Sequence, residues 1–350
     1  MAGVSWFFIA FWPNSFHPAK KPTPMIKLNR RQAIVRTART AVAGALGGVY
    51  ATLPAAAAAP EPPPPAAAPV TVGLATFGFP TLSNADLARE LAGAGVRTIQ
   101  LFLSQTDSNF WRYNSRSDLS SLTDDRCRAI ADVYRQAGIA IHSLGVYTNL
   151  IHPDPAERRA NLDYFEAMMR VGHAMGVRMF INEAGDYHPP EPAPGLAYPF
   201  REEVWRRMIV TGKELAGLAE RHDAVVLMEP FFGGFLASAK RTRLFLEEVG
   251  SPRIRALLDP ANLLELNDLE EMFDQLRPFI DCFHAKDRKL HVERGVPAGE
   301  GDLDYRKFVT LAAQRAPHAP MILEYVGPDN YRQALHHLRE TLRAVGLGAV

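Results

Sequence analysis

Short β-rich runs alternate with amphipathic helical runs from residue 70 to the end of the chain. The helical runs have the lengths expected for crossover connections between parallel strands. The run after Asp154 is typical, because Asp154 can cap a helix and Pro155 suits its first position. Leu162, Phe165 and Met169 then recur at helical spacing. The predicted strands are 70–78, 98–104, 139–147, 178–185, 224–232, 254–264, 280–286 and 320–326.

Eight strand–helix units over residues 70–350 predict an α/β fold, a (β/α)8 TIM barrel, which typically needs about 250 residues. The rival is a doubly wound open sheet, which normally carries a Gly-rich phosphate loop after its first strand. Here the first strand ends Ala75-Thr76-Phe77-Gly78-Phe79-Pro80, without a GxGxxG pattern. No Walker-type or GxSxG motif follows elsewhere in the chain, so the barrel is the preferred fold.

Residues 1–69 differ in composition and hydrophobic pattern from the rest of the chain. An Arg30-Arg31 pair precedes a mildly apolar stretch, 41–53, that is shorter than the roughly 20 residues needed to span a bilayer. An A-x-A-like site lies at 55–59, so residues 1–59 resemble a twin-arginine export signal, with Met25 as an alternative start. A Pro-rich linker, 60–69, follows. The expected location is the periplasm or the exterior, or the cytoplasm if this leader is only an Ala/Pro-rich segment.

The amino-acid composition limits the classes of molecule that the protein is expected to bind. The formal net charge of +1 gives no general attraction to nucleic acid or to an anionic membrane. Cys127 and Cys282 lack the spacing of a metal motif and are expected to be buried, unpaired thiols. We therefore expect a small-molecule substrate, no nucleic acid partner and no stable membrane span, and a homo-oligomer is compatible with the sequence.

Metal-capable side chains end four consecutive predicted strands, the fifth to the eighth. Barrel active sites lie at the C-terminal ends of the strands. Because side chains alternate along a strand, each of these polar residues should top an apolar, inward-facing column. Isolated buried carboxylates cost several kcal/mol each, so a converging group needs a cation. The four residues are Glu229, Asp259, His284 and Glu324, above Leu227, Leu257, Cys282 and Ile322.

One imidazole and three carboxylates form a hard, mostly oxygen donor set. Such a set favours one divalent ion of the Mn²⁺, Mg²⁺ or Co²⁺ type over a thiolate-type Zn²⁺ site. The alternative is that each polar residue is paired locally, with Lys286, Arg288 or Arg255 as partners. That alternative has to hold at four matching strand ends at once, so we prefer the metal.

Several runs resemble the xylose-isomerase-like TIM barrel superfamily, the sugar phosphate isomerase/epimerase family. They are Leu258-Asp259-Pro260-Ala261-Asn262, then Phe283-His284-Ala285-Lys286-Asp287-Arg288, then 299–305, with 149–154 before the third helix. The resemblance implies that Glu229, Asp259, His284 and Glu324 bind one divalent metal. It also implies that Glu229 and Glu324 are catalytic, as proton-transfer bases on opposite faces of the substrate.

Further residues are candidates for substrate binding. Asn262 stands where many family members have a histidine, so it can hydrogen-bond a hydroxyl but cannot carry a proton. Lys286 and Asp287 could orient His284 or bind substrate, or form a surface ion pair. Arg288, His142 at the end of strand three and Glu183 at the end of strand four complete the set, with a core histidine as the alternative for His142.

Two other features border the predicted site. His188 lies in a Pro-rich loop, 187–199, that could serve as a lid or be an ordinary surface loop. Aromatic residues near the early strand ends could form an apolar substrate wall or simply pack in the core. They are Phe77, Phe79, Phe102, Phe110 and Trp111.

The predicted function is a metal-dependent isomerase or epimerase of a sugar or keto-sugar, acting through a metal-stabilised enediolate. The same ligands suit a lyase or dehydratase on a 3-keto-glycoside or inosose. An endonuclease IV-like enzyme is less favoured, because Asn262 replaces a histidine and the chain is not basic. A non-catalytic sugar-binding barrel would need no metal.

Overall fold

The computed structural model describes residues 69–186 and 195–350. The predicted leader, the linker up to residue 68, and His188 with residues 187–194 of its loop lie outside the described residues. The remainder of that loop, Gly195–Phe200, forms a 3-10 helix, η1.

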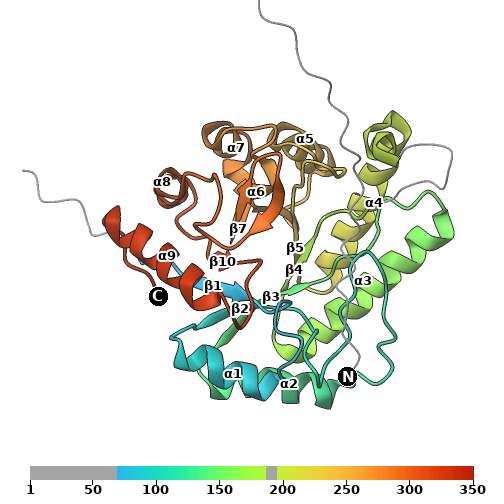
Figure 1. Ribbon diagram of the computed structural model, residues 1–350. Helices are drawn as coiled ribbons and strands as arrows, with labels where there is room; N and C mark the ends of the chain where they lie inside the picture. The colour runs from blue at the N-terminus through green and yellow to red at the C-terminus, as the bar shows by residue number, and fades with distance from the viewer. Residues whose placement is uncertain (1–68, 187–194) are drawn as a thin grey trace, which may run out of the picture. The chain divides into compact units, whose positions relative to one another are not determined.

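Eight parallel strands form a closed barrel in the order β1-β10-β7-β6-β5-β4-β3-β2. The barrel closes because β1 pairs with β2, Leu74 opposite Ile99, and with β10, Gly73 opposite Ile322. Helices surround these strands in Figure 1, and the predicted barrel fold is confirmed. The barrel strands are β1 Val72–Ala75, β2 Thr98–Leu101, β3 Ala140–Gly145, β4 Met179–Asn182, β5 Val225–Met228, β6 Ile254–Leu258, β7 Ile280–Ala285 and β10 Met321–Leu323.

The connections between strands carry the predicted helices. Helix α3, Pro155–Met175, starts as its sequence predicts, because the Asp154 side chain accepts a hydrogen bond from Ala156 N and Pro155 opens the first turn. Gly176 ends the helix in the left-handed conformation, φ 79°. The other helices are α1 Asn84–Gly93, α2 Asp124–Gln136, α4 Glu202–Arg221, α5 Ala239–Val249, α6 Pro260–Leu263, α7 Leu269–Leu276, α8 Tyr305–Arg315 and α9 Tyr331–Ala344, with the 3-10 turn η2 Arg277–Phe279.

The barrel interior is filled by a cluster of side chains that is separate from the core between strands and helices. Leu227, Leu257, Cys282 and Ile322 are fully buried in this interior cluster, as strand alternation predicts. Cys282 is unpaired, as is the buried Cys127 on α2, so both expected thiols are confirmed. The apolar floor beneath the four metal-capable residues is therefore in place.

Two local expectations differ from the structure. Strand six was predicted to run to residue 264, but it ends at Leu258 and Pro260–Leu263 form the short helix α6. Pro260 suits a first helical turn, and Asp259 Oδ1 caps it by accepting a hydrogen bond from Asn262 N at 3.2 Å. An unpredicted antiparallel hairpin, β8 Asp287–Lys289 and β9 Glu293–Val296, follows β7. These strands are too short and polar for a clear sequence signal.

Across residues 69–186 and 195–350, we find no helix with both the length and the apolarity that a membrane span requires.

Candidate metal centre and active site

The C-terminal ends of four neighbouring strands bring four metal-capable side chains together. Glu229, Asp259 and Glu324 directly follow β5, β6 and β10, and His284 lies near the end of β7. One potential ligand atom from each residue lies within 4.8 Å of the others, and all four residues are buried. Residues separated by 95 positions in the chain thus meet because parallel strands end at the same rim of the barrel.

The imidazole of His284 lies between the three carboxylates and Gln100. Its Nδ1 lies 3.1 Å from Glu229 Oε1, 3.5 Å from Glu324 Oε2 and 3.8 Å from Asp259 Oδ2. Its Nε2 lies 2.7 Å from Gln100 Oε1 on β2. An amide oxygen accepts but does not donate, so Nε2 carries the hydrogen and Nδ1 is left to face the carboxylates.

Lys286 is a buried cation beside these carboxylates, and its single positive charge does not neutralise all three of them. Its Nζ lies 2.7 Å from Glu324 Oε2 and 2.9 Å from Asp259 Oδ2. The geometry at Asp259 is not that of a hydrogen bond, so the buried Oδ2 has no hydrogen-bond partner. Three buried carboxylates around the Nδ1 of one imidazole form a donor set that fits a divalent cation with oxygen and nitrogen ligands.

Burial and the closeness of the charges shift the pKa values of Asp259, His284 and Glu229. Burial raises the pKa of Asp259 to about 6, even though the Lys286 charge acts in the opposite direction. For His284, burial favours the neutral form, but the charges of Glu324 and Glu229 prevail and raise its pKa to about 9. For Glu229, burial is likewise outweighed by the His284 charge, which holds its pKa below the usual value. Metal binding here therefore requires a proton to leave His284.

Both oxygens of Glu229 are held by neutral donors. The Tyr147 hydroxyl donates to Oε2 at 2.9 Å, and Asn262 Nδ2 donates to Oε1 at 3.0 Å. Asn262 comes from the first turn of α6, whose position depends on the Asp259 cap. The Asp-x-x-Asn spacing therefore places one residue as a potential ligand and the other as a hydrogen-bond donor to a second potential ligand.

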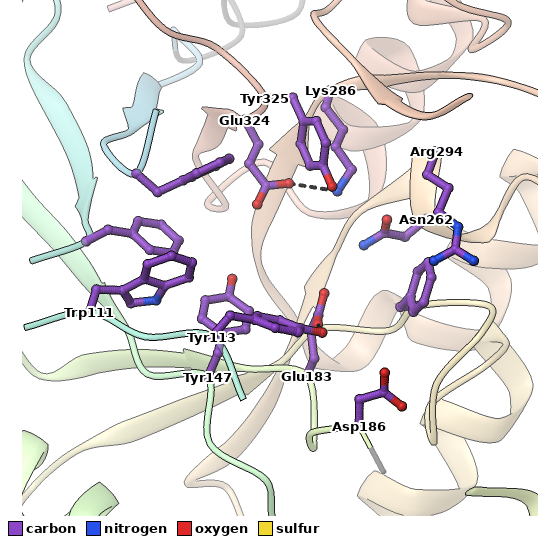
Figure 2. Close-up of a pocket in the computed structure, with 13 residues that line it drawn as sticks. Trp111, Tyr113, Tyr147, Glu183, Asp186, Asn262, Lys286, Arg294, Glu324 and Tyr325 are labelled. Atoms are coloured by element: carbon purple, nitrogen blue, oxygen red, sulfur yellow. Dashed lines mark hydrogen bonds and ion pairs between the residues drawn. The ribbon is translucent and has the colours of Figure 1, made fainter. Parts of the chain in front are cut away.

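A cavity of about 280 Å³ opens over these groups, near the lower end of the usual size for small-molecule sites. Figure 2 shows Trp111 on one side of the cavity and Asn262 and Arg294 on the opposite side. One wall is therefore aromatic, and the other offers charged and amide groups. The cavity is lined by Phe77, Phe102, Trp111, Tyr113, Tyr147, Glu183, Asp186, Phe231, Asn262, Lys286, Arg294, Glu324 and Tyr325.

The aromatic wall comes from the first two strand–helix connections. Phe77, Phe102 and Trp111 line the cavity, with ring centroids 5.2 Å apart for Phe77–Phe102 and 5.3 Å for Phe102–Trp111. Phe79 and Phe110 belong instead to the core between strands and helices. Three of the five aromatic residues singled out in the sequence thus form a wall, and two only pack.

Glu183 is a third cavity-lining carboxyl group besides Glu324 and Asp186, and it directly follows β4. Its Oε2 accepts a hydrogen bond from the Tyr113 hydroxyl at 2.8 Å. Burial, followed by the nearby Glu229 charge, raises its pKa to about 8. The next residue, Ala184, has a left-handed backbone, φ 74°, stabilised by its N–H donating to the Asn182 side chain. Such strain is often found where a functional side chain is positioned.

Three other candidates lie away from the cavity lining. Asp287 Oδ1 accepts hydrogen bonds from Arg288 N at 2.8 Å and from Leu303 N at 2.9 Å. Arg288 is buried and donates from Nε to Ala261 O at 2.7 Å. These two residues anchor the hairpin and the loop after it. His142 lies in the middle of β3 rather than at its end, and burial lowers its pKa to about 4.

Sequence reasoning missed several residues of the site. Gln100 and Tyr147 were detectable in principle, because each stands at an inward-facing position of its predicted strand, as does Phe102 two residues after Gln100. Arg294 lies on the unpredicted hairpin, and Tyr325, which follows Glu324, has a left-handed backbone, φ 57°. Nothing in the linear pattern indicates that these last two side chains face the cavity.

Residues 88–341 match the family model described as xylose isomerase-like TIM barrel. A comparison with curated proteins finds no significant match.

Solved structures with the same fold share little sequence with this chain. A probable 3-DHS dehydratase from Bacillus anthracis has 18% identity and a TM-score of 0.63, covering 78% of this chain and 98% of that one. The 3-keto-D-glucoside 4-epimerase of E. coli has 16% identity and a TM-score of 0.60, with 77% and 98% covered. A xylose isomerase-like TIM barrel protein from Mycobacterium smegmatis, in complex with magnesium, has 16% identity and a TM-score of 0.57, with 79% and 96% covered.

Proposed function

Because this chain belongs to the xylose isomerase-like TIM barrel family, we propose that it is a divalent-metal-dependent isomerase or epimerase of a sugar or keto-sugar. One observation carries the proposal. Four buried side chains with metal-ligand chemistry converge, and one of them, Glu324, lines a cavity of small-molecule size. The magnesium complex of a structural neighbour is consistent with a hard cation in such a barrel.

Glu229, Asp259, His284 and Glu324 would hold the metal, with Mg²⁺, Mn²⁺ or Co²⁺ preferred by their donor atoms. A bound cation supplies positive charge where negative charge develops on the substrate oxygens. The protein supplies the bases. A carbon-bound proton beside a carbonyl is weakly acidic, and a positioned carboxylate is needed to remove it.

Glu324 lines the cavity and is the candidate base on one side of the substrate. Glu229 is the candidate on the other side, with Tyr147 and Asn262 fixing its orientation. Returning the proton to the opposite face of the same carbon gives epimerisation, and returning it to the neighbouring carbon gives isomerisation. Lys286 Nζ lies 2.7 Å from Glu324 Oε2 and would fix the orientation of that carboxylate.

Glu183 favours a second candidate, a lyase or dehydratase. Its raised pKa, about 8, leaves this cavity carboxyl largely protonated at neutral pH. A protonated acid can donate to a departing hydroxyl or alkoxide while another carboxylate takes the proton from the adjacent carbon. The likeness to a probable 3-DHS dehydratase is compatible with such an elimination on a keto-sugar or inosose.

We further propose that the substrate is not phosphorylated and that the enzyme works in the periplasm or outside the cell. Support comes from the paired arginines and apolar stretch of the leader, which resemble an export signal. Fractionation of cells that express the full chain tests the location, and an Arg30→Lys, Arg31→Lys variant should then accumulate inside.

Solvent-exchange mass spectrometry tests the reaction. Purified protein is analysed for bound metal and then incubated in D₂O with a panel of free and keto-sugars. We expect one deuterium in a product of otherwise unchanged mass, and no exchange after Glu324→Gln. Loss of water or of an alcohol identifies the lyase instead. Exchange that persists in Glu324→Gln contradicts the assigned base, and protein that binds sugar without metal or turnover indicates a binding module.

A further inference from the structure

A second, polar depression lies beside the aromatic cavity. This groove, of about 540 Å³, is open to solvent and shares Asp186 with the cavity. Among the described residues that line it, none is a large hydrophobic side chain. They are Asn114, Ser115, Arg116, Asn149, His152, Glu157, Asn161 and Asp186.

A narrow ridge separates the groove from the cavity. Asn114 Nδ2 donates to the Asp186 backbone O at 2.8 Å, and Asp186 N donates back to Asn114 Oδ1 at 2.9 Å. The preceding residue, Tyr113, faces the cavity, while Asn114 faces the groove. Asn149 also donates to Asp186 O, at 2.7 Å. Adjacent residues thus line the two depressions and Asp186 lines both, so a single elongated molecule can occupy both sides.

The groove is polar and slightly acidic, because the Asp186 carboxylate adds to the Arg116–Glu157 ion pair. Arg116 is neutralised by Glu157 at 2.9 Å and also donates to Asn161 at 2.6 Å. The Ser115 residue is exposed in the groove, and the Arg116 and Glu157 side chains are 34% and 45% exposed, so a ligand hydroxyl can reach them. Hydroxyl-rich, uncharged ligands match this surface better than an anion or an apolar group.

We propose that this groove is a second sugar subsite and that the natural substrate is a glycoside of at least two rings. The proposal rests on the proposed function, because the reacting ring must occupy the cavity beside Glu324. Figure 2 shows Glu324 and Lys286 at one end of the cavity and Asp186 at the other. A ring that meets Glu324 therefore has its far end directed at Asp186, where the groove begins, and the glycosidic bond crosses the ridge.

Blocking the groove without altering the cavity tests the subsite. Ser115 lines the groove and is exposed, so Ser115→Trp fills the groove without removing a buried side chain. Ser120 lies on the same connection, is also exposed and does not line the groove, so Ser120→Trp is the matched control. Turnover by metal-loaded protein is compared for methyl 3-ketoglucoside and 3-ketomaltose, which share a reacting ring and differ in the second ring.

We expect Ser115→Trp to lower kcat/KM for 3-ketomaltose at least 10-fold and for the methyl glycoside less than 2-fold, with no effect of Ser120→Trp. The inference is overturned if both substrates are affected equally, or if neither is, while the proposed function stands because turnover is retained.

A binding experiment covers the case in which neither substrate is turned over, which would count against the proposed function. Saturation-transfer NMR with maltose then reports which ring contacts the protein. Signals from both rings in the wild type, with one ring lost in Ser115→Trp, support the subsite. Equal signals in the wild type and Ser115→Trp, or no signals, overturn it.

Discussion

His284 is held on its far side by Gln100, whose Oε1 lies 2.7 Å from His284 Nε2 inside the barrel. The two residues are 184 positions apart and both fully buried. This contact determines which imidazole nitrogen faces Glu229, Asp259 and Glu324. Groups behind a ligating histidine commonly set its tautomer and orientation, and their loss costs about 10–100-fold in metal affinity.

Replacing Gln100 with Leu should therefore weaken metal binding about 10–100-fold with little change in fold. Glu at the same position keeps an acceptor oxygen and should restore most of the affinity. Titration of the metal-free protein against a competing chelator measures both. Gln136→Leu, at an exposed site at the end of α2, serves as the control, and an unchanged affinity in Gln100→Leu would show that the contact is incidental.

Removing Lys286 should make the protein depend on metal for its stability. Lys286→Met leaves Asp259 and Glu324 without their buried cation, and such a change typically costs about 3–5 kcal/mol. A divalent ion should offset much of this, so added Mg²⁺ or Mn²⁺ should raise Tm more in Lys286→Met than in the wild type. Calorimetry measures the shifts.

Lys289→Met is the matched control, because Lys289 pairs with Glu293 at 3.2 Å on the surface. Exposed pairs contribute about 0–1 kcal/mol, so this variant should melt like the wild type. If added metal raised Tm equally in both lysine variants, this would argue against a cation-binding role for the carboxylates.

His142 should make stability fall on acidification. Burial is the main cause that lowers its pKa from 6.5 to about 4, so the unfolded chain binds more protons between these values. The free energy of unfolding is therefore unaffected by His142 above pH 6.5. It falls as the pH drops from 6.5 toward 4, by about 3 kcal/mol at most. In urea unfolding at pH 7.5 and pH 5, His142→Gln should lose less stability than the wild type. The nearby charged groups, Asp281 and His284, remain in both proteins.

A packing defect beneath the site should be costly. Leu257 is fully buried in the barrel interior, two residues before Asp259, so Leu257→Ala should lower the free energy of unfolding by about 2–5 kcal/mol. Leu244 on α5 is 41% exposed, and Leu244→Ala should change stability far less. Chemical denaturation of both variants compares the loss of stability in the barrel interior with that at the exposed position on α5. A small loss in Leu257→Ala would mean that the interior tolerates a cavity.

Some parts of the structure followed from local pattern. Strand alternation was sufficient to predict that Leu227, Leu257, Cys282 and Ile322 face inward, because a closed barrel allows only two directions for a strand side chain. The cap at Asp154 and the left-handed Gly176 depend on neighbours within a few residues, and both were predictable for that reason. The hairpin after β7 was not, since its short polar strands pair only with each other.

By itself, the sequence determined the barrel, the inward parity of its strands and the four metal-capable residues at the strand ends, since these depend on periodicity and on the common rim of parallel strands. Only the tertiary structure decided which other side chains join them. Gln100 reaches His284 across the barrel, Tyr113 meets Glu183 from another connection, and Asp287 turns to the loop instead of the cavity. Such contacts join residues 16 to 184 positions apart, and their geometry is set by barrel closure and loop packing, which no local pattern encodes.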